Sequence, residues 1–259
     1  MVETRRKPRI FYGWWIVFAA ATAQALSGGF YFYGFSTFFM PLIRDFGWSR
    51  TAISGAFSLS RIEGGLLGPI GGFLVDKFGP RKIMIFGITL MGTGFILLSQ
   101  VDSLLSFYLL FTLCIAVGAT LGIHQSLLVA IANWFLKKRG MAMGIGLSGV
   151  GLGGMLVAVL AWLIVQYDWR LTAVFTGIIV WVIGIPVALV MRHRPEDYGY
   201  LPDGEIREEP ETGSPPSTLL TEENPSSQDI SFTPRQALRT KAFWLLALMF
   251  GLRQFIISA

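Results

Sequence analysis

Two charged residues, Arg61 and Glu63, lie near the middle of a long, glycine-rich apolar run at about residues 51–75. A guanidinium group can bind a carboxylate through two parallel hydrogen bonds, and a carboxyl group can carry a proton. On a helix the two side chains would point about 200° apart, so we do not expect them to pair with each other. Because charges at the mid-depth of a bilayer are costly, they predict a functional role.

Two interpretations remain open for each of these charges. Arg61 would bind an anionic solute or pair with a distant helix. Glu63 would carry a proton or neutralise a base elsewhere in the protein. Arg253, in the last apolar run, is a further candidate ligand for an anion.

Polar side chains also occur in the first apolar run. Gln24 and Tyr31 are seven residues apart, so an α-helix would place them on one face, with Gly28 between them. We predict that they line a solute cavity, although packing inside the protein is an equally simple interpretation.

The fourth apolar run contributes Gln125 and His124. Gln125 would share a helix face with Gly118 and Gly122, whereas His124 would point elsewhere. We predict Gln125 as a solute-binding residue. Histidine titrates near neutral pH, which makes His124 a candidate for proton coupling, with a purely structural role as the alternative.

The composition indicates the environment of these residues. The chain has 259 residues, of which 53% are hydrophobic and 14% charged. A soluble domain has about 25% charged residues, so this composition predicts an all-α polytopic protein embedded in a lipid bilayer. The net charge of +5 does not indicate a nucleic-acid partner, because the basic residues stand at the ends of apolar runs.

Enzyme chemistry is not indicated. The single cysteine, Cys114, excludes an internal disulfide and a zinc cluster. The sequence has no nucleotide-binding loop, no metal-ligand spacing and no Ser-His-acid set near a membrane face. We expect no catalytic residue, metal or cofactor.

Six apolar runs are long enough to cross about 30 Å of hydrocarbon. We place them at 13–41, 50–76, 81–100, 104–134, 140–166 and 171–191, after an N-terminal tail at 1–12. One set of loops carries twelve basic residues, namely Arg5, Arg6, Lys7, Arg9, Lys77, Arg81, Lys82, Lys137, Lys138, Arg139, Arg192 and Arg194. The opposite loops carry three, namely Arg44, Arg50 and Arg170. The positive-inside rule therefore predicts that the N-terminus and the basic loops are cytoplasmic.

Residues 192–240 differ from the rest of the chain. They combine seven prolines with ten of the 16 acidic residues. Such a segment buries too little apolar area to fold, so we expect a mostly disordered cytoplasmic linker. A seventh apolar run begins at 241 and is still apolar at Ala259, which predicts a truncated seventh span.

The strongest motif closes the second apolar run. It consists of Gly72, Asp76, Lys77, Gly79, Arg81 and Lys82. This pattern in a short cytoplasmic loop resembles the loop 2–3 signature of the major facilitator superfamily, with Pro80 at a position where Arg is also common. The resemblance implies an N-terminal six-helix half of a twelve-span transporter, in which these residues form a cytoplasmic gate. The alternative is that the loop charges only set the topology.

Other features agree with that family. Glycines four residues apart, such as Gly64, Gly68 and Gly72, allow helices to approach closely in lipid, as do the pairs Gly118 and Gly122, and Gly149 and Gly153. A shift of 89 residues aligns Arg50 with Arg139 and maps the first three spans onto the next three. A three-span unit must insert its second copy inverted, which predicts the 3+3 inverted repeat of a major facilitator half.

Three segments narrow the resemblance to one branch. They are Tyr12-Gly13-Trp14-Trp15, Trp48-Ser49-Arg50-Thr51-Ala52, and Arg194-Pro195-Glu196-Asp197-Tyr198-Gly199 followed by Pro202-Asp203-Gly204. They look like the bacterial monocarboxylate and oxalate/formate transporters, which implies a bacterial inner membrane and a small organic anion as the solute. Drug/proton antiport is not implied, because the Gly-Pro of span 5 and the Arg of span 4 are absent.

Two functions therefore remain. The first is a secondary active transporter that works by alternating access, with an organic anion or a non-anionic solute as its substrate and the proton as a candidate coupling ion. The second is a transport-inactive half-transporter or membrane scaffold.

Overall fold

A computed structural model describes residues 11–198, 200, 203, 239–245 and 248–249. The chain divides into two compact units, Met1–Glu208 and Glu209–Ala259. In the second unit, residues 241–245 and 248–249 are helical. Arg253 lies outside the described residues, as does most of the predicted linker.

Every regular element in the described part of the chain is a helix. In order they are α1 (Tyr12–Leu26), η1 (Ser27–Tyr33), η2 (Gly34–Phe38), α2 (Phe39–Phe46), α3 (Arg50–Phe78), α4 (Pro80–Leu98), α5 (Leu104–Leu109), η3 (Leu110–Ala116), η4 (Gly118–Gln125), α6 (Ser126–Trp134), α7 (Arg139–Gly153), α8 (Leu156–Tyr167), α9 (Trp169–Val190) and η5 (Glu196–Tyr198). Segments η1, η3 and η4 are π-helical, and η2 and η5 are 3₁₀-helical.

Five continuous helical stretches are long and apolar enough to cross a membrane. They are Tyr12–Phe46, Pro80–Leu98, Leu104–Trp134, Arg139–Tyr167 and Trp169–Val190. Their bounds agree with the predicted spans to within a few residues, so the protein is a multi-pass membrane protein. The second predicted span, 50–76, coincides with α3, a helix of 29 residues that is not among the five. Arg61, Glu63 and the many Gly and Ser residues of α3 lower its hydropathy.

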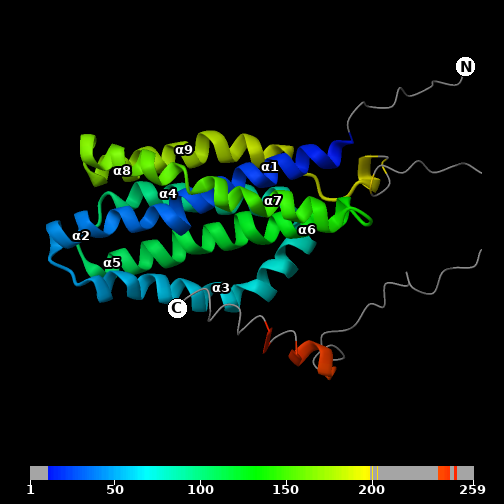
Figure 1. Ribbon diagram of the computed structural model, residues 1–259, viewed down its shortest axis with the longest axis horizontal. Coiled ribbons are helices and arrows are strands. Elements are labelled where there is room, and N and C mark those ends of the chain that lie inside the picture. The colour runs from blue at the N-terminus through cyan, green and yellow to red at the C-terminus, as the bar shows by residue number, and fades with distance from the viewer. Residues whose placement is uncertain (1–10, 199, 201–202, 204–238, 246–247, 250–259) are drawn as a thin grey trace, which may run out of the picture. The chain divides into compact units, whose positions relative to one another are not determined.

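The helices of the first unit lie side by side, and α3 runs along one edge of the bundle (Figure 1). Glycines bring several neighbours into backbone contact. A Cβ atom on Gly118 would lie 2.6 Å from the carbonyl oxygen of Gly87 in α4. A Cβ on Gly177 in α9 would lie 2.5 Å from that of Gly92 in α4. Small residues therefore allow these helix pairs to approach closely, as expected for helices that associate in lipid.

Polar side chains and left-handed turns set the helix ends. Ser49 caps α3 by accepting a hydrogen bond from the Ala52 amide at 3.1 Å. Ser103 and Ser106 form a reciprocal capping box at the start of α5. Between α3 and α4 the chain turns at Gly79, with φ 84° and ψ 150°. Between α8 and α9 it turns at Asp168, with φ 81° and ψ 155°.

These two turns are related by the repeat found in the sequence. The shift of 89 residues that aligns Arg50 with Arg139 also aligns Gly79 with Asp168. In the described residues, positive φ angles occur only at Gly47, Gly79, Asp168 and Asp203. The equivalent turns thus share an uncommon backbone conformation, which supports a duplicated three-helix unit.

Candidate functional site

The first pair of predicted site residues meets between α1 and η4. Gln24, which is 2% exposed, places its Nε2 atom 3.4 Å from Nδ1 of His124. His124 itself is exposed. The structure therefore brings together a predicted solute-binding residue and a predicted proton-coupling residue from two different spans.

Tyr31 contacts a different helix. Its hydroxyl group donates to Ser60 Oγ in α3 at 3.1 Å, and Ser60 Oγ donates in turn to the Phe57 carbonyl oxygen at 2.8 Å. The Tyr31 ring stacks on Phe57 and packs against Phe111. Tyr31 is only 8% exposed, so this contact fixes the first span against α3.

Gln24 and Tyr31 do not lie on one face with Gly28, contrary to the prediction. Gly28 lies against the backbone of Val150 in α7, whereas Gln24 faces η4 and Tyr31 faces α3. The reason is the π-helical segment η1, which contains Tyr31. Its i→i+5 hydrogen bonds add about one residue to each turn, so the α-helical spacing no longer predicts the face.

The same correction applies to the fourth span. Gly118 and Gly122 pack against Gly87 of α4. Gln125 lies instead beside α3, where a Cβ on Gly71 would be 3.0 Å from its Cγ atom. The π-helical segment η4 turns Gln125 away from the two glycines, because the turn is wider than the prediction assumed.

Arg61 and Glu63 behave as their spacing predicts. The Arg61 side chain is exposed on α3, and no hydrogen bond or ion pair holds it among the described residues. Both carboxyl oxygens of Glu63 are buried and have no hydrogen-bond partner. Helix α3 thus carries, among the described residues, an exposed cation at Arg61 and a buried acid at Glu63, each without a partner. An unpaired buried carboxylate is costly, and binding a proton or a cation relieves that cost.

The glycine row of α3 is less closely packed than predicted. Open space surrounds Gly65 and Gly72, and Cβ atoms on Gly64 and Gly68 would have only ordinary contacts, with Thr120 and Gln125. Gly71 makes the close contact, because a Cβ atom there would lie 2.7 Å from the Leu121 side chain of η4. The exposed side of this row lies near Arg61, so it is available to a solute or another helix.

The predicted gate motif lies at the end of α3 and the start of α4. Gly79 occupies a backbone region that other residues rarely adopt, and Pro80 starts α4. Lys77 Nζ lies 5.4 Å from the Phe78 ring centroid. Asp76 is exposed and has no hydrogen bond or ion pair to any described residue. Arg81 and Lys82 are exposed as well.

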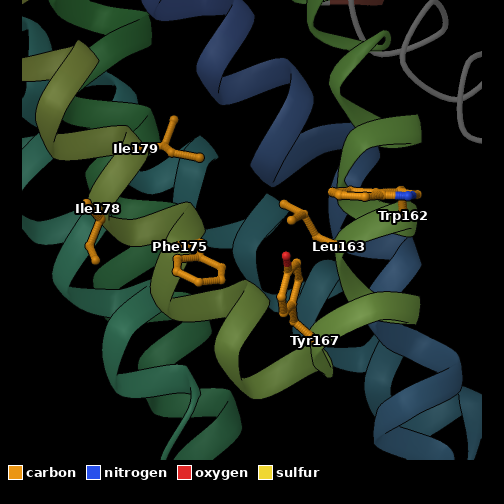
Figure 2. A pocket seen from close by; sticks show the side chains of 6 residues that line it. All are labelled: Trp162, Leu163, Tyr167, Phe175, Ile178 and Ile179. Carbon is orange, nitrogen blue, oxygen red and sulfur yellow. The ribbon is translucent and has the colours of Figure 1, made fainter.

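A separate pocket of about 350 Å³ lies between α8 and α9. Its lining is Trp162, Leu163, Tyr167, Phe175, Ile178 and Ile179 (Figure 2). Only the indole N–H and the phenol O–H could donate a hydrogen bond there, and none of the predicted site residues lines it. An anion would find no positive charge in this pocket, so we do not assign the solute to it.

Comparison with known proteins identifies the family. The pattern of the Major Facilitator Superfamily matches residues 20–259. The chain belongs to this superfamily. Its members are membrane transporters rather than enzymes, as the motif Gly72–Lys82 predicts.

Individual relatives are similar over half of the chain or more. It is 30% identical over 216 residues to the oxalate:formate antiporter of Oxalobacter formigenes, covering 83% of this chain and 46% of that protein. It is 31% identical over 171 residues to monocarboxylate transporter 13 of Rattus norvegicus, covering 66% of this chain and 40% of that protein. A fujikurins efflux protein of Gibberella fujikuroi is 32% identical over 133 residues, covering 50% of this chain and 27% of that protein. The chain thus spans less than half the length of these relatives.

The sequence of this major facilitator chain did not predict the structural contacts of several polar residues. Ser60 is buried and accepts a hydrogen bond from Tyr31, but in a Ser-rich helix the sequence indicates only a small packing residue. Thr112, which is 7% exposed, keeps its Oγ1 atom without a partner in η3. Asn133, His193 and Asp203 make long-range contacts at the basic ends of the helices. Their contacts depend on tertiary structure, so no local signal could have revealed them.

Proposed function

We propose that the chain is the N-terminal half of a secondary active transporter that carries small organic anions by alternating access. The observation that carries this proposal is the unpaired, exposed guanidinium of Arg61 in a chain that belongs to the major facilitator superfamily. The similarity to an oxalate:formate antiporter and to monocarboxylate transporters supports an anion as the solute.

The proposal includes α3 as a membrane span, the second in chain order, which brings the number of spans to six. At 1.5 Å per residue its 29 residues measure about 43 Å, which exceeds the hydrocarbon thickness. The equivalent turns at Gly79 and Asp168 support a 3+3 inverted repeat, in which they lie on opposite sides of the membrane. The basic loops would then face the cytoplasm of a bacterial cell, and the protein would reside in the inner membrane.

In this proposal the solute lies between this bundle and the second half of the transporter. Arg61 binds its carboxylate through charge-assisted hydrogen bonds. Gln24 contacts η4, whereas Tyr31 and Gln125 contact α3, and the three side chains would position the solute or the helices around it. Arg253 is retained as a second anion ligand on sequence grounds.

Glu63 and His124 are proposed to couple transport to protons. Glu63 offers a buried carboxyl group without a fixed partner, and such a group can accept or release a proton without breaking a hydrogen bond. His124 can exchange its hydrogen bond with Gln24 when its protonation changes, because the two ring nitrogens differ in donor and acceptor roles.

The residues of the Gly72–Lys82 motif are proposed to close the cytoplasmic side. Asp76, Arg81 and Lys82 are exposed and without partners in the described residues, so they are available to the second half of the transporter. Formation and release of such contacts would distinguish the inward-closed from the inward-open state.

The test is uptake by membrane vesicles that contain the complete protein. Labelled oxalate, formate, lactate and pyruvate are supplied with and without a pH gradient. We expect uptake of at least one anion, and loss of most of it in Arg61→Gln. Arg44→Gln, which removes an exposed arginine from the opposite loops, serves as the matched control and should leave uptake intact.

The outcomes separate the alternatives. Unchanged uptake in Arg61→Gln would remove Arg61 from the solute site. Transport of other solutes but none of the four anions would favour a non-anionic substrate. Correctly inserted protein that moves no solute would favour the membrane scaffold.

A further inference from the structure

The segment that follows α9 is attached to the ends of several helices in the first unit. We call residues 191–198, 200 and 203 the clasp. Asp203 makes the first of its three attachments. Its carboxylate accepts hydrogen bonds from the backbone amides of Leu136 at 2.9 Å, Lys137 at 2.6 Å and Lys138 at 3.3 Å.

These three amides stand directly before α7, which begins at Arg139. The first amides of a helix have no partner within the helix, and a negative charge there is favourable. Asp203 therefore holds the turn that leads into α7, more than sixty residues earlier in the chain, and places its negative charge near the N-terminus of that helix. The cap residue of the helix itself, Lys138, provides no side-chain hydrogen bond.

A second attachment joins the clasp to the start of α1. The Arg192 guanidinium carbon lies 3.9 Å from the Tyr12 ring centroid and 4.1 Å from the Tyr198 ring centroid. The cation is thus stacked between an aromatic ring of α1 and one of the clasp. The Tyr12 hydroxyl group donates to the Val190 carbonyl oxygen at 2.8 Å, which ties α1 to the end of α9 as well.

A third attachment joins the clasp to the end of α6. Asn133 Nδ2 donates to the His193 carbonyl oxygen at 3.1 Å, and Trp134 Nε1 donates to that of Arg192 at 3.3 Å. Tyr200 packs its ring against Trp134. The clasp thus contacts α1, α6 and α7, which belong to the first, fourth and fifth predicted spans.

We propose that the clasp holds the start of α1, the end of α6 and the start of α7 as one body, with Asp203 and Arg192 as its positioning residues. Short loops join α6 to α7, but α1 is connected to them only through packing and the clasp. Separating the three ends would break three hydrogen bonds to one carboxylate and expose a stacked guanidinium. The device would let a transporter half move as a unit, yet it does not depend on which solute is carried.

The charge of Asp203 agrees with this role. Partial burial acts to raise the pKa of Asp203, but the amides of Lys137, Leu136 and Lys138 and the charge of Lys138 outweigh it, so the pKa is lowered from its ordinary value of 3.8. A lowered folded-state pKa means that the carboxylate stabilises the fold above the ordinary pKa. This stabilisation is lost as the pH falls through the folded-state pKa, so the clasp stays closed at neutral pH.

Hydrogen exchange of the full chain in lipid nanodiscs tests the proposal. In Asp203→Ala, the amides of Leu136, Lys137 and Lys138 should exchange about 10- to 100-fold faster, because each loses a hydrogen bond to a charged group. Asp203→Asn keeps an acceptor oxygen but loses the charge, so an intermediate increase is expected. Amides at the centre of α4 should not change and would report intact folding.

The matched control is Asp197→Asn, which removes a carboxylate from the same segment. Asp197 is exposed and has no hydrogen bond to the described residues, so the three amides should exchange as in the parent chain. Unchanged exchange in Asp203→Ala, or equal acceleration in Asp197→Asn, would overturn the clasp. Because the readout is amide exchange, failure of the clasp is distinct from failure of the transport proposal, which uptake tests.

Discussion

The turn between α3 and α4 and the turn between α8 and α9 have the same backbone shape but different surroundings. Gly79 and Asp168 have φ angles of 84° and 81°, and each is followed at once by a helix. The two positions are equivalent under the shift of 89 residues that aligns Arg50 with Arg139. A conformation that only glycine adopts freely is therefore occupied once by glycine and once by aspartate.

The two residues that follow Asp168 in the second turn are held by contacts within the bundle. Trp169 Nε1 donates to Asp45 Oδ2 at 2.7 Å, and Arg170 Nη1 donates to the Ser99 carbonyl oxygen at 2.5 Å. The Arg170 guanidinium also stacks on the Trp169 ring, 4.6 Å from its centroid. The turn is closed by contacts to the ends of α2 and α4.

The side chains around the first turn are not satisfied in this way. Asp76, Arg81 and Lys82 are exposed and make no hydrogen bond or ion pair within the described residues. The second turn is therefore fixed by contacts of Trp169 and Arg170 within the bundle. The charged side chains Asp76, Arg81 and Lys82 around the first turn have no partner among the described residues. Such charges are the ones that a second transporter half would engage.

The largest effect is expected at Arg170, the counterpart of Arg81. Arg170→Ala removes a hydrogen bond to a charged group and a cation–π contact, which should lower the free energy of unfolding by about 3 kcal/mol. Arg81→Ala removes an exposed arginine and should change it by less than about 0.5 kcal/mol. Unfolding in mixed micelles would measure both, and equal losses would contradict the difference between the turns.

Exchanging the residues at positions 79 and 168 tests whether both turns have the same backbone conformation. Gly79→Asp places a Cβ atom in a strained conformation and should cost about 1–3 kcal/mol of unfolding free energy. The same equilibrium unfolding measurement applies. No loss would show that the left-handed conformation at Gly79 is not retained in the folded protein.

The reverse exchange should stabilise the protein. Asp168→Gly relieves strain at a position whose side chain makes no hydrogen bond to the described residues, so a gain of up to about 1 kcal/mol is expected. The melting temperature of the purified protein should rise. A fall would indicate that the Asp168 carboxylate stabilises the turn through a contact of its own.

The smallest effect on stability is expected at Asp76. Asp76→Asn should change the free energy of unfolding by less than about 0.5 kcal/mol, because the carboxylate has no partner in the described residues. Uptake by the complete protein should nevertheless fall if Asp76 serves the cytoplasmic gate. Normal uptake would leave the loop charges with a topological role only.

Hydropathy predicted the helix positions because the length of an apolar run is a local property. Span 104–134 and the helical stretch Leu104–Trp134 coincide, for example. The opposite orientations of Arg61 and Glu63 were also predictable, because α3 is a regular α-helix. The helix faces on which side chains lie in the first and fourth spans were not predictable from the sequence. The π-helical segments η1 and η4 widen the helical turn there, and composition does not reveal π-helices.

The contacts made by the segment that follows α9 were also not predictable from the sequence. Residues after 191 read as linker because they are polar and rich in proline, yet Arg192 and Asp203 are bound by residues more than fifty positions away. Local sequence patterns do not reveal such contacts, because the partners meet only in the folded bundle. The disorder predicted for 204–238 remains a prediction.

The inverted repeat is tested most directly by accessibility of its equivalent turns. Lys77→Cys and Gln166→Cys, again 89 positions apart and both exposed, would be made singly in a Cys114→Ser background. A membrane-impermeant maleimide should label the cysteine at 166 in intact cells, and that at 77 only after permeabilisation. Labelling of both from the same side of the membrane would contradict the account.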